Sequence, residues 1–150
     1  MTTETASAPG AVWSAALHAE VQQFYAYQMQ RLDLGEAEAW ALTFTEDAVF
    51  DVPTLPEPVR GRAGLVASAY GARAALAAAG ERHRHFLGML DVRPRPDGTV
   101  GVRSYAIVYA SEIGGASRVH RVCVCEDVLV RDADGMLRVS ARRVTRDDLP

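Results

Sequence analysis

The sequence predicts an α+β domain in which a strongly curved antiparallel sheet packs on three N-terminal helices. In the first half of the 150-residue chain, apolar residues recur at the three- and four-residue spacing of amphipathic helices. After residue 80 the sequence has β character throughout, and turns containing Gly and Asp divide it into long segments. Consecutive antiparallel strands need a cover for one face, and here only the helices supply it. Long strands rarely stay flat, so we expect a curved sheet with a pocket between it and the helices.

Three helices are predicted before residue 80. Residues 1–11 are small and polar and are expected to form a flexible tail, which leaves residues 12–150 as one domain. The first helix is expected to run from Val12 to a stop at Gly35, the second over residues 36–44, and the third over residues 61–79 with Gly80 as its cap. The inward-facing stripe of the first helix is predicted to hold Trp13, Leu17, Val21, Phe24, Gln28 and Leu32.

Five strands are predicted. The first occupies residues 48–52 between the second and third helices and ends at Pro53. The other four follow the third helix, at residues 84–92, 99–112, 117–131 and 137–145. Turn signals at residues 94–98, 114–115 and 132–135 separate these four strands and favour hairpins.

Composition excludes several classes of function. The formal net charge of −3 disfavours a nucleic-acid protein, which normally carries a basic patch. The chain has no lysine, which rules out Schiff-base catalysis and the P-loop lysine. No apolar run reaches the length of a membrane span, and no signal peptide is visible. We interpret Cys123 and Cys125 as reduced thiols of a cytoplasmic protein.

The sequence contains no pattern typical of a bound metal or cofactor. His83 and His85 are followed by Phe86 rather than by a carboxylate at the offset of a facial triad. No dinucleotide fingerprint follows a predicted strand. We therefore expect neither a metal nor a cofactor.

Five short segments give the chain a family resemblance. They are RLDLG at 31–35, FTEDAVF at 44–50, VRGR at 59–62, ED at 126–127 and RRV at 142–144. In this order the chain resembles SnoaL-like proteins of the nuclear transport factor two-like superfamily, over residues 12–148, and most of all those of bacterial aromatic polyketide pathways. The resemblance implies a cone-shaped, cystatin-like fold with a deep pocket, and its catalytic members mostly use no cofactor. Fold alone does not fix the chemistry.

His85 and Asp33 are the candidate catalytic residues. The segment around His85 resembles the strand of scytalone dehydratase that carries a catalytic histidine, and imidazole exchanges protons near neutral pH. Dehydratase-like members carry a pocket aspartate where Asp33 stands, and a carboxylate there would orient the imidazole. An aspartate at a helix C-terminus is otherwise unfavourable. The alternatives are a histidine bonded at the sheet edge and an aspartate that faces solvent or bonds to its loop.

The resemblance also departs from the dehydratase pattern. Scytalone dehydratase has a second pocket histidine on the next strand, and residues 106–110 contain none. Tyr109 is a candidate hydrogen-bond donor in its place. His120 lies one strand further on and is a poorer substitute, and His83 shares the face of His85 only if the strand already begins there.

Other residues are candidates for substrate binding. Tyr25 on the first helix is expected either to reach the pocket or to be a core residue. Leu87 and Met89 are expected to line the pocket of a flat polycyclic ligand. Arg143 ends an otherwise apolar strand face, so it is expected either to pair with Asp127 or to bind a phenolate or carboxylate of the substrate.

These observations favour a cofactor-independent acid/base enzyme, a dehydratase, cyclase or isomerase acting on a small aromatic or polycyclic ketone. The alternatives are an accessory protein that holds an intermediate without catalysis, and a small structural subunit of a ring-hydroxylating dioxygenase. By analogy with the fold, we expect a homodimer formed through the sheets.

Overall fold

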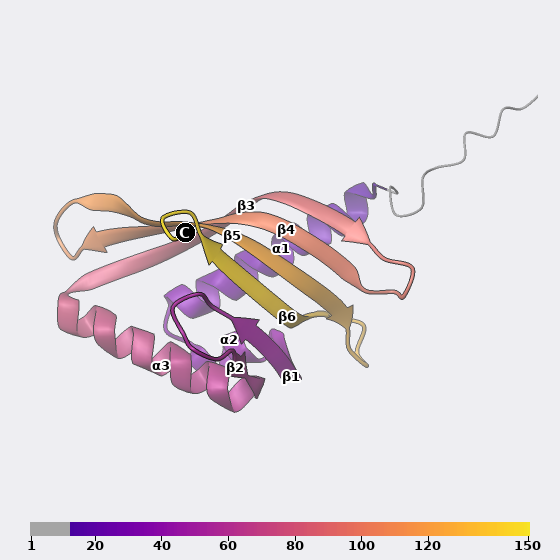
Figure 1. Cartoon of the computed structure of the whole chain (residues 1–150), viewed down its shortest axis with the longest axis horizontal. Coiled ribbons are helices and arrows are strands. Elements are labelled where there is room, and N and C mark those ends of the chain that lie inside the picture. Colours follow the sequence, from indigo (N-terminus) through magenta and orange to yellow (C-terminus); the bar gives the residue numbers. More distant parts are fainter. Residues whose placement is uncertain (1–12) are drawn as a thin grey trace, which may run out of the picture.

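A computed structural model describes residues 13–150 as three helices and one six-stranded sheet (Figure 1). The tail expected at residues 1–11 lies outside the described residues. The elements, in chain order, are α1 (Ala15–Asp33), α2 (Ala37–Ala41), β1 (Phe44–Asp51), β2 (Val59–Arg60), α3 (Gly61–Ala79), β3 (Glu81–Pro94), β4 (Val100–Glu112), β5 (Ser117–Arg131) and β6 (Leu137–Arg146). The α+β class predicted from the sequence is confirmed.

The strands follow the order β2-β1-β6-β5-β4-β3 across the sheet. The hairpins from β3 to β6 are antiparallel, as predicted. The pairing of β1 with β6 is parallel, so the expectation of a wholly antiparallel sheet is wrong at this one place. In the chain, β2, α3 and the strands β3 to β5 separate β1 from β6, and β1 is inserted in the sheet beside this last strand. Figure 1 shows α1 crossing the sheet, with α3 beside β1 and β2.

The helix α1 begins later than predicted. The Ser14 side chain caps its first turn by accepting a hydrogen bond from the Leu17 N–H at 3.2 Å. Trp13 therefore precedes the helix, and its side chain is 74% exposed rather than part of the inward-facing stripe. The buried residues of α1 are Val21, Tyr25, Gln28 and Met29.

The segment after α2 also differs from its prediction. The helix α2 ends at Ala41, and β1 begins at Phe44, although the sequence predicted helix to about residue 44 and strand only from residue 48. Phe44 and Ala48 are fully buried in the core, where Phe44 meets the Trp40 ring edge to face at 5.0 Å. This packing holds the polar residues 45–47 in an extended strand.

Three β-bulges interrupt the long strands. Gly88 pairs with Tyr105 and Asp91 with Arg103, so β3 carries one extra residue between them, where Met89 has a φ of 54°. His120 is the extra residue of β5, and Ser140 is the extra residue of β6. Each bulge bends its strand and reverses the simple alternation of faces beyond it.

Candidate functional site

A cavity of about 810 Å³ lies between the concave face of the sheet and the helices α1 and α3. Most of its lining side chains are apolar, and Leu87 is among them as predicted. The alanine-rich α3 supplies one wall, with Leu65, Ala69, Ala72 and Leu76. A mostly apolar cavity with few polar groups is typical of sites for small organic molecules.

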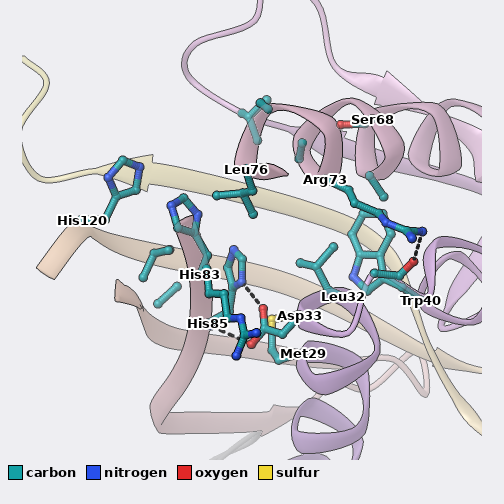
Figure 2. A pocket seen from close by; sticks show the side chains of 18 of the residues that line it. Met29, Leu32, Asp33, Trp40, Ser68, Arg73, Leu76, His83, His85 and His120 are labelled. Atoms are coloured by element: carbon teal, nitrogen blue, oxygen red, sulfur yellow. Dashed lines mark hydrogen bonds and ion pairs between the residues drawn. The ribbon is translucent and has the colours of Figure 1, made fainter. Parts of the chain in front are cut away.

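Asp33 holds His85 by two contacts inside this cavity (Figure 2). The His85 backbone N–H donates to Asp33 Oδ2 at 3.0 Å, and His85 Nδ1 lies 2.6 Å from Asp33 Oδ1. Asp33 is the last residue of α1 and His85 lies early in β3, so the contact joins the end of a helix to the sheet. The sequence-based pairing of these two residues is realised in the geometry.

The Asp33 contact decides how the imidazole is used. An ionised carboxylate only accepts hydrogen bonds, so Nδ1 of His85 carries the proton that faces Asp33. In the neutral form of the imidazole Nε2 keeps its lone pair, and it has no hydrogen bond to any residue in 13–150. The Asp33 side chain is 8% exposed and that of His85 is 28% exposed. The imidazole is therefore accessible from the cavity, whereas the Asp33 carboxylate is almost completely buried. This arrangement makes Nε2 a positioned proton acceptor.

Two further imidazoles extend from His85 along the cavity wall. The ring centroids of His83 and His85 are 6.4 Å apart, and those of His83 and His120 are 4.6 Å apart. All three histidines line the cavity (Figure 2). The pKa of His83 is lowered by burial and by the charge of His85, and the pKa of His120 is lowered by burial and by Arg121. Both shifts favour the neutral form of the imidazole.

His83 and His120 were expected to be weaker candidates than His85, yet both line the cavity with it. His83 shares the face of His85 because β3 already begins at Glu81, which the spacing of the two residues hinted at. His120 reaches the cavity beside Cys123 and Cys125 because it is the extra residue of the β5 bulge. No local signal in the sequence marks that bulge.

A buried polar network lies next to the apolar cavity. Arg142 donates from Nε and Nη2 to the two carboxylate oxygens of Asp127, both at 2.8 Å, and from Nη2 to Gln28 Oε1 at 2.6 Å. The Tyr25 hydroxyl donates to Asp127 Oδ2 at 2.7 Å, and the Cys125 thiol donates to Asp127 Oδ1 at 3.3 Å. Burial, together with the Asp127 charge, raises the pKa of Tyr25 well above its usual value. The charge of Asp127 is thus fully compensated inside the core.

This network corrects two predicted site residues. The partner of Asp127 is Arg142, whereas Arg143 pairs in register with Glu126 and is exposed on the other face. The Ser140 bulge causes the difference, because alternation counted from Leu137 without it assigns the wrong arginine to the inner face. Tyr25 is 2% exposed and bonded to Asp127, so it is a core residue and does not line the cavity.

Two more predicted residues lie away from the cavity. Met89 sits in the β3 bulge and is 78% exposed, while Leu90 and Val92 take the inward positions beyond it. Tyr109 is 43% exposed and does not line the cavity, whereas its neighbour Val108 does. Of the seven predicted site residues, the cavity brings together Asp33, His85 and Leu87.

Within residues 13–150, no three side chains of His, Cys, Asp or Glu converge in the manner of metal ligands. Over the same residues, no helix is both long enough and apolar enough to span a membrane. Cys123 and Cys125 are free, and burial raises the pKa of both thiols.

Comparisons with known proteins agree with this architecture. A family model described as a SnoaL-like domain matches residues 13–143. ActVI-ORFA from Streptomyces coelicolor is 33% identical, with a TM-score of 0.85, over 91% of this chain and 99% of that one. A protein from Catenulispora acidiphila, solved in complex with S-DNPA, is 37% identical, with a TM-score of 0.78, over 90% of this chain and 96% of its own.

A more distant likeness bears on the fold alone. The β subunit of a putative aromatic-ring-hydroxylating dioxygenase from Novosphingobium aromaticivorans is 19% identical, with a TM-score of 0.69, over 91% of this chain and 94% of that one. No curated protein matches the chain at a significant level.

Proposed function

Because the chain belongs to the SnoaL-like domain family and has its nuclear transport factor two-like, cystatin-like fold, we propose that it is a cofactor-independent acid/base enzyme acting on an aromatic ketone of the polyketide type. The observation that carries the proposal is the double contact of Asp33 with His85 inside a mostly apolar cavity. The likeness to ActVI-ORFA and the resemblance to SnoaL-like proteins of polyketide pathways support the substrate class.

Dehydration is the reaction that this geometry supports best. His85 Nε2 takes a proton from the carbon next to the ketone, and the electron pair of that C–H bond delocalises onto the ketone oxygen. The enolate then expels the hydroxyl group of the next carbon, which takes the proton back from the imidazolium and leaves as water. One imidazole thus serves as base and then as acid, and Asp33 stabilises the imidazolium between the two steps.

The neutral rings of His83 and His120 fit a supporting role in this reaction. They extend the polar wall beyond His85, so a departing hydroxyl group or water molecule has hydrogen-bond partners there. The rest of the cavity is apolar and excludes water from the enolate.

A simple β-hydroxy ketone tests the proposal. Loss of water from 3-hydroxy-1-tetralone gives 1-naphthol, whose absorbance is easily followed. We expect the wild-type protein to accelerate this loss, and His85→Ala to reduce turnover by about 100-fold or more. His18→Ala is the matched control, because His18 does not line the cavity. Near-normal turnover by His85→Ala would rule out the proposed role.

A binding protein is the second candidate function. The Catenulispora acidiphila relative was solved with the small molecule S-DNPA, which favours a ligand-holding role for the cavity of this chain as well. Saturable binding of 3-hydroxy-1-tetralone and related aromatic ketones, without release of water and without proton exchange next to the ketone, would favour this candidate. The dioxygenase subunit shares only the fold and adds no support for a role as a structural subunit.

We also propose a homodimer, formed through the outer face of the sheet. Phe86, Ile107 and Val122 are direct cross-strand neighbours on that face, and Tyr105 lies beside them. Phe86 is 62% exposed and Tyr105 is 47% exposed, so these four residues form an outer apolar patch that a second copy would cover. The free thiols of Cys123 and Cys125 support the proposed cytoplasmic location, where thiols stay reduced.

A further inference from the structure

Arg142 is a buried arginine whose guanidinium borders the cavity. Its side chain is 3% exposed, and the residue lines the cavity together with Phe50, Cys125 and Val144. A guanidinium has five N–H donors. Nε–H bonds Asp127, and the two N–H groups of Nη2 bond Asp127 and Gln28. These bonds account for three of the five donors.

The two N–H groups of Nη1 are the remainder. No residue in 13–150 accepts a hydrogen bond from them. Some side-chain nitrogens, such as Trp40 Nε1, are fully buried and have no hydrogen-bond partner. Nη1 of Arg142 is not one of them. Because the side chain is otherwise enclosed and the residue lines the cavity, the cavity is the space that Nη1 faces.

The surroundings of Arg142 make Nη1 a strong and fixed donor. The guanidinium carbon lies 5.8 Å from the ring centre of Tyr25, 5.3 Å from that of Phe44 and 5.7 Å from that of Phe50. In such apolar surroundings a hydrogen bond is stronger than in water. Burial lowers the pKa of Arg142, but the groups around the guanidinium, Asp127 first among them, together outweigh burial and raise the pKa, so the donor keeps its proton. The bidentate pair also fixes the plane of the guanidinium.

Arg142 and His85 mark two separate polar points of one cavity. Both are held by α1, Arg142 through Gln28 and His85 through Asp33. Gln28 and Asp33 are five residues apart, roughly 7.5 Å along a helix axis. The cavity-lining Met29 lies between them in the helix. The Arg142 side chain is more enclosed than that of His85, so Arg142 lies at the inner of the two points.

We propose that Nη1 of Arg142 binds an uncharged oxygen of the ligand, so that a fused-ring aromatic ketone or phenol is anchored at the inner point while another part of it meets His85. The proposal rests on the proposed function for the role of His85, and it adds a specificity-determining residue and the polarity of the ligand. An uncharged oxygen is favoured over a carboxylate, because Asp127 already balances the charge of Arg142.

Binding of two shape-matched probes tests the proposal. 1-Tetralone carries a ketone oxygen and tetralin does not. We expect the wild-type protein to bind 1-tetralone about tenfold more tightly than tetralin, because a hydrogen bond to a charged donor is worth that ratio or more. We also expect the infrared carbonyl stretch of bound 1-tetralone to shift to lower frequency.

Variants identify the donor. The preference and the infrared shift are expected to disappear in Arg142→Gln and to persist in Arg143→Gln, because Arg143 lies on the opposite face. They are also expected to persist in His85→Ala, whose loss of turnover tests the proposed function independently. A preference that survives Arg142→Gln, or that disappears with His85 instead, would overturn the proposal.

Three other results of the binding experiment would also contradict the proposal. They are equal binding of the two probes by the wild-type protein, no binding of either probe, and tighter binding of 1-naphthoate than of 1-tetralone. If Arg142→Gln does not fold, the wild-type protein labelled with ¹⁵N in its guanidinium groups gives the answer. The Nη signals of the buried arginine should then move on addition of 1-tetralone and stay in place with tetralin, and their failure to move would overturn the proposal.

Discussion

Arg142 and Arg143 are consecutive residues of β6, yet their guanidinium groups lie on opposite faces of the sheet. Arg142 is 4% exposed and forms a bidentate pair with Asp127, whereas Arg143 is exposed and stands opposite Glu126. The two positions therefore offer a matched comparison of the same side chain in a buried ion pair and on an exposed face of the sheet.

Substitution of each arginine by methionine should separate the two environments. Arg142→Met leaves the Asp127 carboxylate buried without its cation, so we expect it to lower the free energy of unfolding by about 3–5 kcal/mol. Arg143→Met removes an exposed charge, and we expect little change. Urea unfolding at pH 7 measures both. Equal losses in the two variants would contradict the assignment of Arg142 as the buried partner.

Asp33→Asn should impair turnover more than substrate binding. The amide keeps the size of the side chain but no longer stabilises a positive charge on His85, so we expect kcat for 3-hydroxy-1-tetralone to fall by about 100-fold while KM changes little. Asp51→Asn is the control, because Asp51 does not line the cavity. A large rise in KM with an unchanged kcat would mean that Asp33 acts only in binding.

The stability of the fold should fall with pH below about 6.5, the usual pKa of histidine. Since the pKa values of His83 and His120 are lowered in the folded protein, the unfolded chain binds more protons than the folded one as the pH falls from 6.5 toward those lowered values. The stabilising contribution of the neutral rings is therefore complete above pH 6.5 and declines below it.

Thermal unfolding at pH 7.5 and pH 5.5 measures this dependence. The double variant His83→Gln and His120→Gln should show a smaller difference in Tm between the two conditions than the wild-type protein. His18→Gln, outside the cavity, should leave the difference unchanged. An unchanged difference in the double variant would show that these two histidines do not carry the effect.

The outer apolar patch should hold two copies of the chain together. Light scattering of the wild-type protein should give twice the 16.2 kDa mass of one chain. Phe86→Arg places a charge on the patch, at its β3 end, and should give the single-chain mass, while Arg84→Ala on the same strand face should not. A wild-type mass of 16.2 kDa would refute the dimer.

Much of the fold was predictable from the sequence. The spacing of apolar residues indicates a helix or a strand, and cap and turn residues indicate where each one ends. The helix α3 spans Gly61–Ala79 as predicted, and Gly80 ends it with a φ of 65° that glycine adopts at no cost. The strand β5 also has its predicted bounds, Ser117–Arg131. The contact of Asp33 with His85 bridges 52 residues, and only the family resemblance connected two residues so far apart.

Three of the errors in the site have a common physical origin. A strand alternates its faces with a period of two, so one bulge changes the face of every residue counted across it. The bulge at Met89 turned a predicted lining residue outward, the one at His120 brought an unexpected imidazole into the cavity, and the one at Ser140 exchanged Arg143 for Arg142. Tertiary packing and curvature fix such bulges, and no local residue pattern in these three strands specifies them.

The helix α1 holds both polar points of the cavity, while α3 supplies much of its apolar wall through Ala69, Ala72 and Ala75. The position of the polar groups and the volume of the cavity therefore depend on different helices. Larger side chains on α3 would narrow the space for a ligand without displacing Arg142 or His85. Substitutions on α3 alone could therefore change which ring system of a ligand fits the cavity, while Arg142 and His85 keep their positions.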